Sequence, residues 1–198
     1  MELENINNQF NNELQQQIEG TLPKGHIYSL GCPKVNLLSA GLPDLPIELS
    51  AERLSKKASV NYGHPFDLSE LKNLPKAINE PIAVFDSTKK DESKVILTEL
   101  QNKSDNYIVI VKIRKSIDNR KVDVSVNSIR SIYPKNNISG IIDWINSKDN
   151  LLLWIDEEKA LNFISTQSTN LIASGNKIQD STINIINNFT NVKVKNIK

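Results

Sequence analysis

The chain has 198 residues, which is enough for one domain with short appendages. Its 24 Lys and Arg residues nearly balance its 23 Asp and Glu residues, and the net charge of +1 argues against a non-specific DNA-binding protein. A ribonuclease stays compatible with this charge because it needs only a few phosphate contacts. The single cysteine, Cys32, excludes an internal disulfide and fits a reducing compartment.

The first 20 residues predict an amphipathic helix that Gly20 ends. The apolar side chains that recur at helical spacing are Leu3, Ile6, Phe10, Leu14 and Ile18. This segment is acidic and rich in Asn and Gln, unlike a signal peptide, and no apolar run of the chain approaches the roughly 20 residues of a transmembrane helix. Pro23 and Gly25 separate the helix from the rest, so it either docks on the following domain or is a remnant of a longer polypeptide.

Residues 25–46 are punctuated by Gly and Pro and predict turns around short elements. Ser50 and Asp67 are good N-cap residues for the short helices that follow them. The short elements and helical turns predicted in this part of the chain are 27–30, 35–38, 51–57, 68–74 and 75–78.

Four segments rich in Val and Ile follow, joined by short polar stretches that favour antiparallel hairpins and a meander. They are 81–85, 94–100, 107–114 and 122–126. After these strands we expect an amphipathic helix over 138–145 capped by Asn136 or Asn137, a strand over 151–155, and a helix from Asp156 to about residue 166.

These elements predict the α+β class, with N-terminal helices followed by a mainly antiparallel four- to five-stranded sheet and C-terminal helices. The absence of a long helix between the strands argues against a doubly wound parallel sheet. We expect an N-terminal helix over 1–20, one folded domain over 21–175 and a polar tail over 176–198.

His64 is the first candidate for chemistry. It lies between Gly63, which permits an unusual turn, and Pro65, which favours an extended backbone at His64. A histidine held in this way can act as a general acid or base near neutral pH, or its ring can simply bond to a neighbouring group in a tight turn. The other histidine, His26, is the weaker candidate.

Lys112 and Arg114 end an apolar strand two residues apart, so they should share one face of it. Two cations in this position suit a phosphate clamp, although they would equally mark where the strand emerges into water.

The Val alternation of the next strand breaks after Asn127. Three alternatives follow from this: a β-bulge at 127–128, a bend towards another strand, or one helical turn. If the strand continues, Ser128 and Arg130 should share one face, and Ser131 and Tyr133 the other.

Metal and cofactor sites have little support. Two distant histidines, one cysteine between turn residues and no cluster of carboxylates do not form a zinc site or a two-metal site. The sequence also contains no phosphate-binding loop, dinucleotide fingerprint or nucleophile elbow. We therefore expect neither a metal ion nor a cofactor.

An ordered set of short motifs resembles the phage MuF C-terminal domain family, over roughly residues 25–175. The motifs are Leu30-Gly31-x-Pro33 with Gly41, Pro46-Ile47-x-Leu49, Leu54-x-Lys56, His64-Pro65, Leu74-Pro75, Glu80-Pro81-Ile82-Ala83-Val84-Phe85-Asp86-Ser87, Val126-Asn127-Ser128-Ile129-x-Ser131-Ile132-Tyr133 and Leu151-Leu152-x-Trp154. The resemblance implies the fold of the nuclease-toxin superfamily that includes barnase, EndoU, colicins and RelE.

The resemblance also implies a toxin-type, metal-independent endoribonuclease of phage or mobile-element origin. Its catalytic residues would be His64, Ser131 and Tyr133. Strand position adds the residues that would bind phosphate or RNA, which are Lys112, Arg114, Ser128 and Arg130. The implied partners are an RNA substrate such as tRNA or mRNA and an immunity or antitoxin protein, with no membrane. The implied location is the cytoplasm of a bacterial host, reached with a phage particle or a secretion system.

Two other hypotheses are compatible with the same sequence. The modest net charge and the lack of a second well-placed histidine favour a non-catalytic phage or mobile-element interaction module, in which His64 would be structural. A different enzyme in the same cleft, such as a nucleotidyl- or ADP-ribosyl-transferase, is the third.

Overall fold

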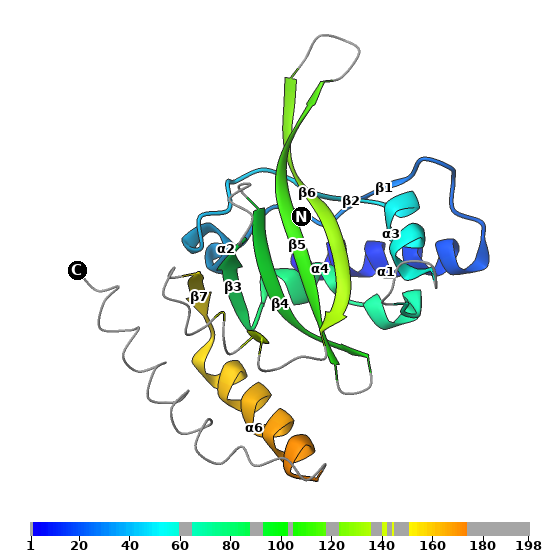
Figure 1. Ribbon diagram of the computed structural model, residues 1–198. Helices are drawn as coiled ribbons and strands as arrows, with labels where there is room; N and C mark the ends of the chain where they lie inside the picture. The colour runs from blue at the N-terminus through cyan, green and yellow to red at the C-terminus, as the bar shows by residue number, and fades with distance from the viewer. Residues whose placement is uncertain are drawn as a thin grey trace.

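The computed structural model describes residues 2–59, 65–87, 93–102, 105–117, 123–135, 140–141, 144 and 151–173. For residues 102, 105–117, 123–125 and 167–173 the description covers the backbone alone. Within these ranges a seven-stranded sheet has the order β1-β2-β6-β5-β4-β3-β7 (Figure 1). Helices pack against both of its faces, which confirms the α+β class.

Four consecutive strands form the predicted antiparallel meander, because short connections join β3 to β4, β4 to β5 and β5 to β6. The sheet exceeds the predicted four or five strands because two short N-terminal strands join it, and β2 pairs with β6 in parallel. The strands are β1 (Ile27–Ser29), β2 (Ile47–Ser50), β3 (Ala83–Asp86), β4 (Ser93–Asn102), β5 (Asp105–Ile117), β6 (Asp123–Lys135) and β7 (Leu152–Ile155).

Three of the helix ends lie at capping residues that the sequence provides. Gly20, at φ 75°, ends the first helix, and the Ser50 hydroxyl accepts from the Arg53 backbone N–H at 3.3 Å. The Asp67 carboxylate caps a 3₁₀ turn at Leu68–Leu71. The helices are α1 (Leu3–Glu19), α2 (Val35–Ser39), α3 (Ala51–Ala58), α4 (Leu74–Asn79) and α6 (Glu157–Ala173).

The N-terminal helix packs on the domain. Phe10 and Leu14 of α1 are 1% and 0% exposed, and they belong to the main core cluster between the helices and one face of the sheet. Asn7 and Asn11 of α1 also donate to the Asn73 side-chain oxygen at 2.6 and 2.9 Å, just before α4 begins. In Figure 1, α1 and α4 lie behind the sheet.

The opposite face of the sheet is covered by α6. Ala160 and Ile164 of this helix pack with Ile141 over apolar side chains of β3 and β4. The cover does not extend to the other end of the same face, where Ile27 and Ser29 of β1 are exposed. One face of the sheet is therefore buried by α6 at one end and open at the other.

Candidate functional site

The candidate site lies along the half of β6 that follows its short pairing with β2. β2 pairs only with Asn127 and Ser128 of β6, which continues well beyond them. At that edge of β6, the Arg53 guanidinium of α3 donates from Nη1 to the Ile129 carbonyl oxygen at 3.0 Å. Because Ser50 ends β2 and caps α3, the chain turns directly from pairing with β6 into a helix beside it.

A β-bulge determines which side chains of β6 share a face. Ile129 pairs with Val111 of β5, and Ser131 pairs with the preceding residue, Ile110. Arg130 is therefore the extra residue on the bulged strand, and its side chain is exposed.

The extra residue shifts the alternation by one position, so Ser128, Ser131 and Tyr133 all lie on one face of the sheet. Ile129 and Ile132 are 0% and 2% exposed and pack in the main core on the other face. The bulge thus gathers hydroxyl groups on the face that α6 partly covers.

Of the three predicted alternatives, the structure contains the first, a β-bulge, but at a different position. The bulge lies at Arg130 rather than at 127–128. We predicted that Ser128 would lie on one face of the sheet and that Ser131 and Tyr133 would lie on the other. This prediction is wrong, because the extra residue of the bulge places all three side chains on the same face.

Asn127 anchors the strand just before the bulge. It is 0% exposed, and its Nδ2 atom donates to the carbonyl oxygens of Pro43 and Leu45 at 2.9 and 2.8 Å. Its backbone N–H donates to the Pro46 carbonyl oxygen at 2.8 Å. Asn127 therefore ties the loop before β2 to β6, which is a structural role.

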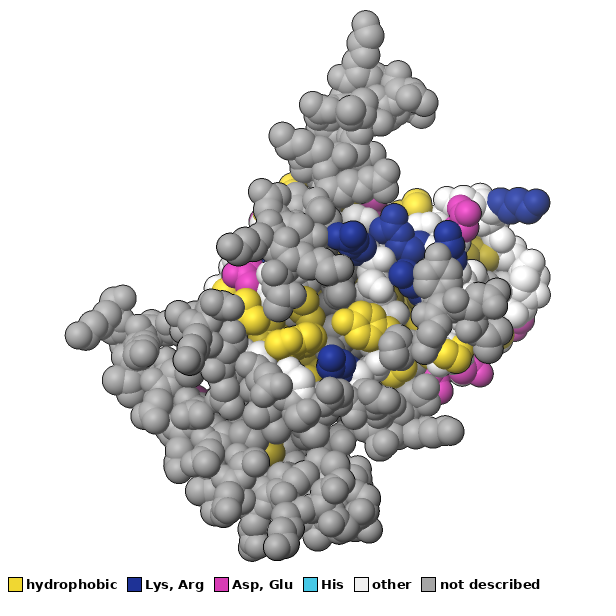
Figure 2. Space-filling view, in the orientation of Figure 1, with side chains coloured by type: hydrophobic (Ala, Val, Ile, Leu, Met, Phe, Trp, Pro, Cys, Tyr) yellow, Lys and Arg dark blue, Asp and Glu magenta, His cyan; other side chains and the backbone are white. Residues whose placement is uncertain are grey.

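Basic side chains of α3 and β6 lie around this edge. Arg53 and Lys57 line a small hollow together with Ser131, and the hollow leaves no space for a water molecule. Lys56 follows on the last turn of α3, and Arg130 is exposed on β6. Figure 2 shows Lys and Arg side chains gathered over the region of β6 and α3. Such a group of cations suits a phosphate-rich ligand.

His64 lies outside the described residues. The description stops after α3 and Ser59 and resumes at Pro65. Phe66, two positions after the histidine, is 8% exposed and packs in the main core cluster, which also contains Ile132 of β6.

The two predicted cations of β5 are described by their backbones alone. Lys112 is the Cα partner of Ser128, and Arg114 is the partner of Val126, so both lie on the face that carries the hydroxyl groups. Lys112 also pairs with Ser93, the first residue of β4. Beyond the pair of Ser93 and Lys112, β4 no longer accompanies β5, and β5 and β6 continue as a two-stranded arm that contains Arg114 (Figure 1).

Tyr133 packs on the second core cluster, beside Trp144 and the side chains that α6 covers. This burial raises the pKa of the Tyr133 phenol above its ordinary value. The group therefore stays protonated near neutral pH and can donate a hydrogen bond.

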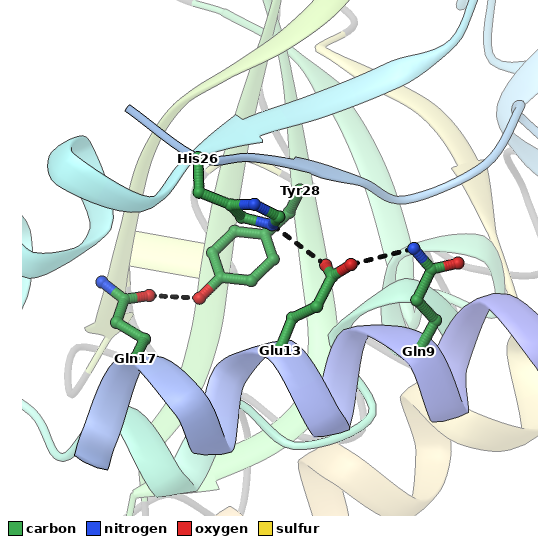
Figure 3. A network of polar contacts seen from close by, with 5 residues as sticks. All are labelled: Gln9, Glu13, Gln17, His26 and Tyr28. Carbon is green, nitrogen blue, oxygen red and sulfur yellow. Dashed lines mark hydrogen bonds and ion pairs between the residues drawn. The ribbon is translucent and has the colours of Figure 1, made fainter. Parts of the chain in front are cut away.

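The second histidine belongs to a polar network between α1 and β1 (Figure 3). His26 Nε2 lies 3.1 Å from Glu13 Oε2, and Gln9 Nε2 donates to the other carboxylate oxygen of Glu13 at 2.8 Å. The His26 ring meets the Tyr28 ring edge to face with centroids 4.9 Å apart. The Tyr28 hydroxyl donates to the side-chain oxygen of Gln17.

This network holds α1 on the sheet. Tyr28 is 0% exposed, and burial raises the pKa of its phenol, with the Glu13 carboxylate adding to the effect. Gln17 also donates from Nε2 to the Ala51 carbonyl oxygen at 2.8 Å, so the network reaches the start of α3. We assign His26 a structural role.

Among the described residues, no three His, Cys, Asp or Glu side chains are grouped so that they could hold a metal ion. No helix in the described part of the chain is long and apolar enough to cross a membrane.

Comparison with protein families matches residues 55–162, more than half of the chain, to the phage MuF-C-terminal domain. The match confirms the family predicted from the ordered motifs, over a shorter stretch than the predicted residues 25–175. It contains every predicted site residue, whereas α1, β1 and β2 precede it. Neither the curated proteins nor the solved structures contain a match to this chain.

Proposed function

The chain belongs to the phage MuF C-terminal domain family, and on that premise we propose that it is a toxin-type, metal-independent endoribonuclease. One observation carries the proposal. The bulge at Arg130 gives Ser128, Ser131 and Tyr133 a common face of the sheet, and Ser131 also lines a hollow with the α3 cations Arg53 and Lys57. Neutral hydroxyl donors next to cations suit a phosphodiester, whose negative charge increases during cleavage.

The proposed reaction is transesterification at an RNA phosphate. The ribose 2′-oxygen loses its proton and attacks phosphorus, and the bond from phosphorus to the 5′-oxygen breaks as that oxygen gains a proton. The products are a 2′,3′-cyclic phosphate and a 5′-hydroxyl group. His64 serves as the acid or base, and Ser131 and Tyr133 hold the phosphate oxygens. Lys112, Arg114 and Arg130 offset the charge on the phosphate, and Ser128 contacts the RNA.

The partners and location follow from the proposed activity. The substrate is cellular RNA, such as tRNA or mRNA, and an immunity or antitoxin protein would protect the cell that makes the toxin. The site of action is the cytoplasm of a bacterial host, reached with a phage particle or a secretion system.

The direct test incubates purified wild-type, His64→Ala and Ser131→Ala proteins with total RNA in excess EDTA. We expect discrete cleavage by the wild type, products that end in a 2′,3′-cyclic phosphate, and a loss of activity in both variants of about 100-fold or more. Induced expression of the wild type, but not of His64→Ala, should arrest bacterial growth. A folded wild-type protein that neither cleaves nor binds RNA at low salt would overturn the proposal.

The second candidate function is a non-catalytic interaction module. The favouring observation is that Glu13 and Tyr28 engage His26 between α1 and β1, so the one histidine among the described residues has a structural role. A module of this kind predicts that His64→Ala lowers stability and leaves partner binding unchanged wherever the protein folds. A stable His64→Ala protein that has lost RNA cleavage would exclude it.

A further inference from the structure

A line of polar residues crosses the sheet on the face that carries Ser128. In Cα register, Ser29 of β1 lies opposite Glu48 of β2, and Glu48 lies opposite Ser128 of β6. Ser128 in turn lies opposite Lys112 of β5, which lies opposite Ser93 of β4. Register partners on adjacent strands project from the same face, so five strands contribute to one polar row.

The next row on this face is mostly apolar. Two residues further along the strands, Phe85, Val95 and Ile110 are register partners, and Ser131 is the next partner on β6. Phe85 and Val95 are buried under the cover that α6 provides. The polar row therefore interrupts an otherwise apolar surface at the border of its covered part.

Exposure falls along the polar row from β1 to β4. Ser29 is exposed, Glu48 and Ser128 are partly buried, and Ser93 is 2% exposed. The Ser93 hydroxyl oxygen has no hydrogen-bond partner within the part of the chain that the structure describes. A buried hydroxyl without a partner is uncommon in folded proteins and calls for an explanation, such as a bound water molecule or a functional role.

Glu48 is the carboxylate of this row. It lies between Ser29 and Ser128, and the position of Lys112 is one strand further on. An ionised carboxylate can accept a proton from a hydroxyl group, and cleavage of RNA needs one group that accepts a proton and one that donates. Glu48 is the one carboxylate of this row, so it is the side chain of the row that can accept a proton.

We propose that Glu48 accepts the 2′-hydroxyl proton in the cleavage reaction, beside Ser128, which contacts the RNA, and Lys112, which offsets the charge on the phosphate. This role rests on the proposed function. The proton passes from the 2′-oxygen to the Glu48 carboxylate as the bond from that oxygen to phosphorus forms. The bond from phosphorus to the 5′-oxygen breaks, and the 5′-oxygen takes a proton from His64, which therefore serves as the acid. Neither an oxidant nor a further reactant is needed.

The experiment compares wild type with Glu48→Gln, which removes the proton acceptor and keeps the shape of the side chain. Cleavage of an RNA oligonucleotide in EDTA gives kcat and KM at a series of pH values. A 2′-O-methyl oligonucleotide, which has no 2′-hydroxyl to react, measures binding alone. The control is Glu52→Gln, which removes the same charge from the first turn of α3.

We expect Glu48→Gln to lower kcat by about 100- to 10,000-fold, with binding of the 2′-O-methyl oligonucleotide within about threefold of wild type. The acidic limb of the wild-type pH profile, where the acceptor becomes protonated, should disappear in Glu48→Gln and remain in Glu52→Gln. Glu48→Asp keeps a carboxylate, so it should retain the acidic limb at a reduced kcat.

The outcomes separate the two proposals. A wild-type protein that cleaves RNA together with a Glu48→Gln protein of normal rate and profile would overturn the role of Glu48 alone. The same conclusion would follow if Glu48→Asp lost the acidic limb while remaining active. A folded wild-type protein that does not cleave RNA overturns the proposed function, and the role of Glu48 with it.

Discussion

Asn127 and Pro43 lie 84 positions apart in the chain, yet Asn127 Nδ2 donates to the Pro43 carbonyl oxygen at 2.9 Å. With the second bond to Leu45, this contact fixes the loop before β2 against β6, one strand position before Ser128. The row of polar residues through Glu48 and Ser128 depends on this parallel register. A buried amide that touches no substrate thus helps to set the geometry of the proposed site.

Asn127→Asp should destabilise the protein by at least about 2 kcal/mol. The carboxylate oxygen that replaces Nδ2 cannot donate, so two buried carbonyl oxygens lose their partner, each at a cost of about 1–3 kcal/mol. Urea unfolding at neutral pH measures the difference. Asn162→Asp, at an exposed position of α6, is the control and should change stability by less than about 0.5 kcal/mol. Equal unfolding midpoints for the two variants would show that the Asn127 contacts do not stabilise the fold.

Lys57→Gln should weaken RNA binding and reduce its salt dependence. Lys57 lines the hollow with Ser131, whereas Lys72 is an exposed residue after the 3₁₀ turn and provides the matched control. Each phosphate contact by a cation contributes about 0.7 to the slope of log affinity against log salt for a single strand. We expect the slope of log affinity against log salt to become about 0.7 less steep in Lys57→Gln and to stay unchanged in Lys72→Gln. Titrations at several salt concentrations with a 2′-O-methyl oligonucleotide measure it, and equal slopes in both variants would argue against an RNA contact at α3.

Gly31→Ala should destabilise the protein more than Gly41→Ala. Both glycines have a left-handed backbone, at φ 80° and 81°, so both substitutions carry a similar strain of about 1–2 kcal/mol. A Cβ atom at Gly31 would also lie 2.7 Å from Ile6 Cδ1 of α1, whereas nothing lies within 4 Å at Gly41. Thermal unfolding measures how much more stability Gly31→Ala loses than Gly41→Ala, and this difference is the cost of disturbing the packing of α1. Identical melting temperatures would mean that Ile6 moves aside without cost.

The stability of the protein should fall as the pH rises above about 10. Burial raises the pKa of Tyr28 above its unfolded value, so the unfolded chain releases this proton first and alkaline pH favours unfolding. The stabilisation is complete below the unfolded pKa and is lost as the pH rises towards the folded one. Tyr28→Phe should therefore show a smaller loss of stability between about pH 9 and pH 11. Denaturant curves at both pH values test this, and parallel losses in the two proteins would contradict it.

His26→Ala and Glu13→Ala should lower stability without lowering RNA cleavage. Their contact is partly buried, so a double-mutant cycle should give a coupling of about 0.5–1.5 kcal/mol. Faster hydrogen exchange in α1 would locate the change at the N-terminal helix. If cleavage by folded His26→Ala fell about 100-fold, the structural role assigned to His26 would be wrong.

Local patterns were sufficient to predict much of this fold. The spacing from Leu3 to Ile18 predicted α1, and Ser50 and Asp67 marked the caps that the structure contains. The meander followed from segments rich in Val and Ile and from the short polar connections between them, which act between neighbours in the sequence. Family membership was predictable from the order of short motifs, none of which is specific alone.

Long-range pairing could not be predicted in the same way. β2 spans only Ile47–Ser50, and its partner on β6 lies far downstream, so no local pattern marks it as a strand of the same sheet. Arg53 and Glu48 were missed as site residues for that reason, because the register of β2 and the position of α3 alone bring them to β6. The break after Asn127 gave a bulge as one of three alternatives, and the alternation of side chains could neither choose among them nor fix the position of the bulge.

The edge of β6 also bears on how copies of this chain behave towards one another. An exposed strand edge offers unpaired backbone groups to a second molecule and promotes aggregation. Here the Arg53 guanidinium donates a hydrogen bond to the Ile129 carbonyl oxygen, and the bulge places a charged residue, Arg130, at the next position. Both features oppose the addition of a further strand, so the same stretch that carries the proposed chemistry is protected against self-association.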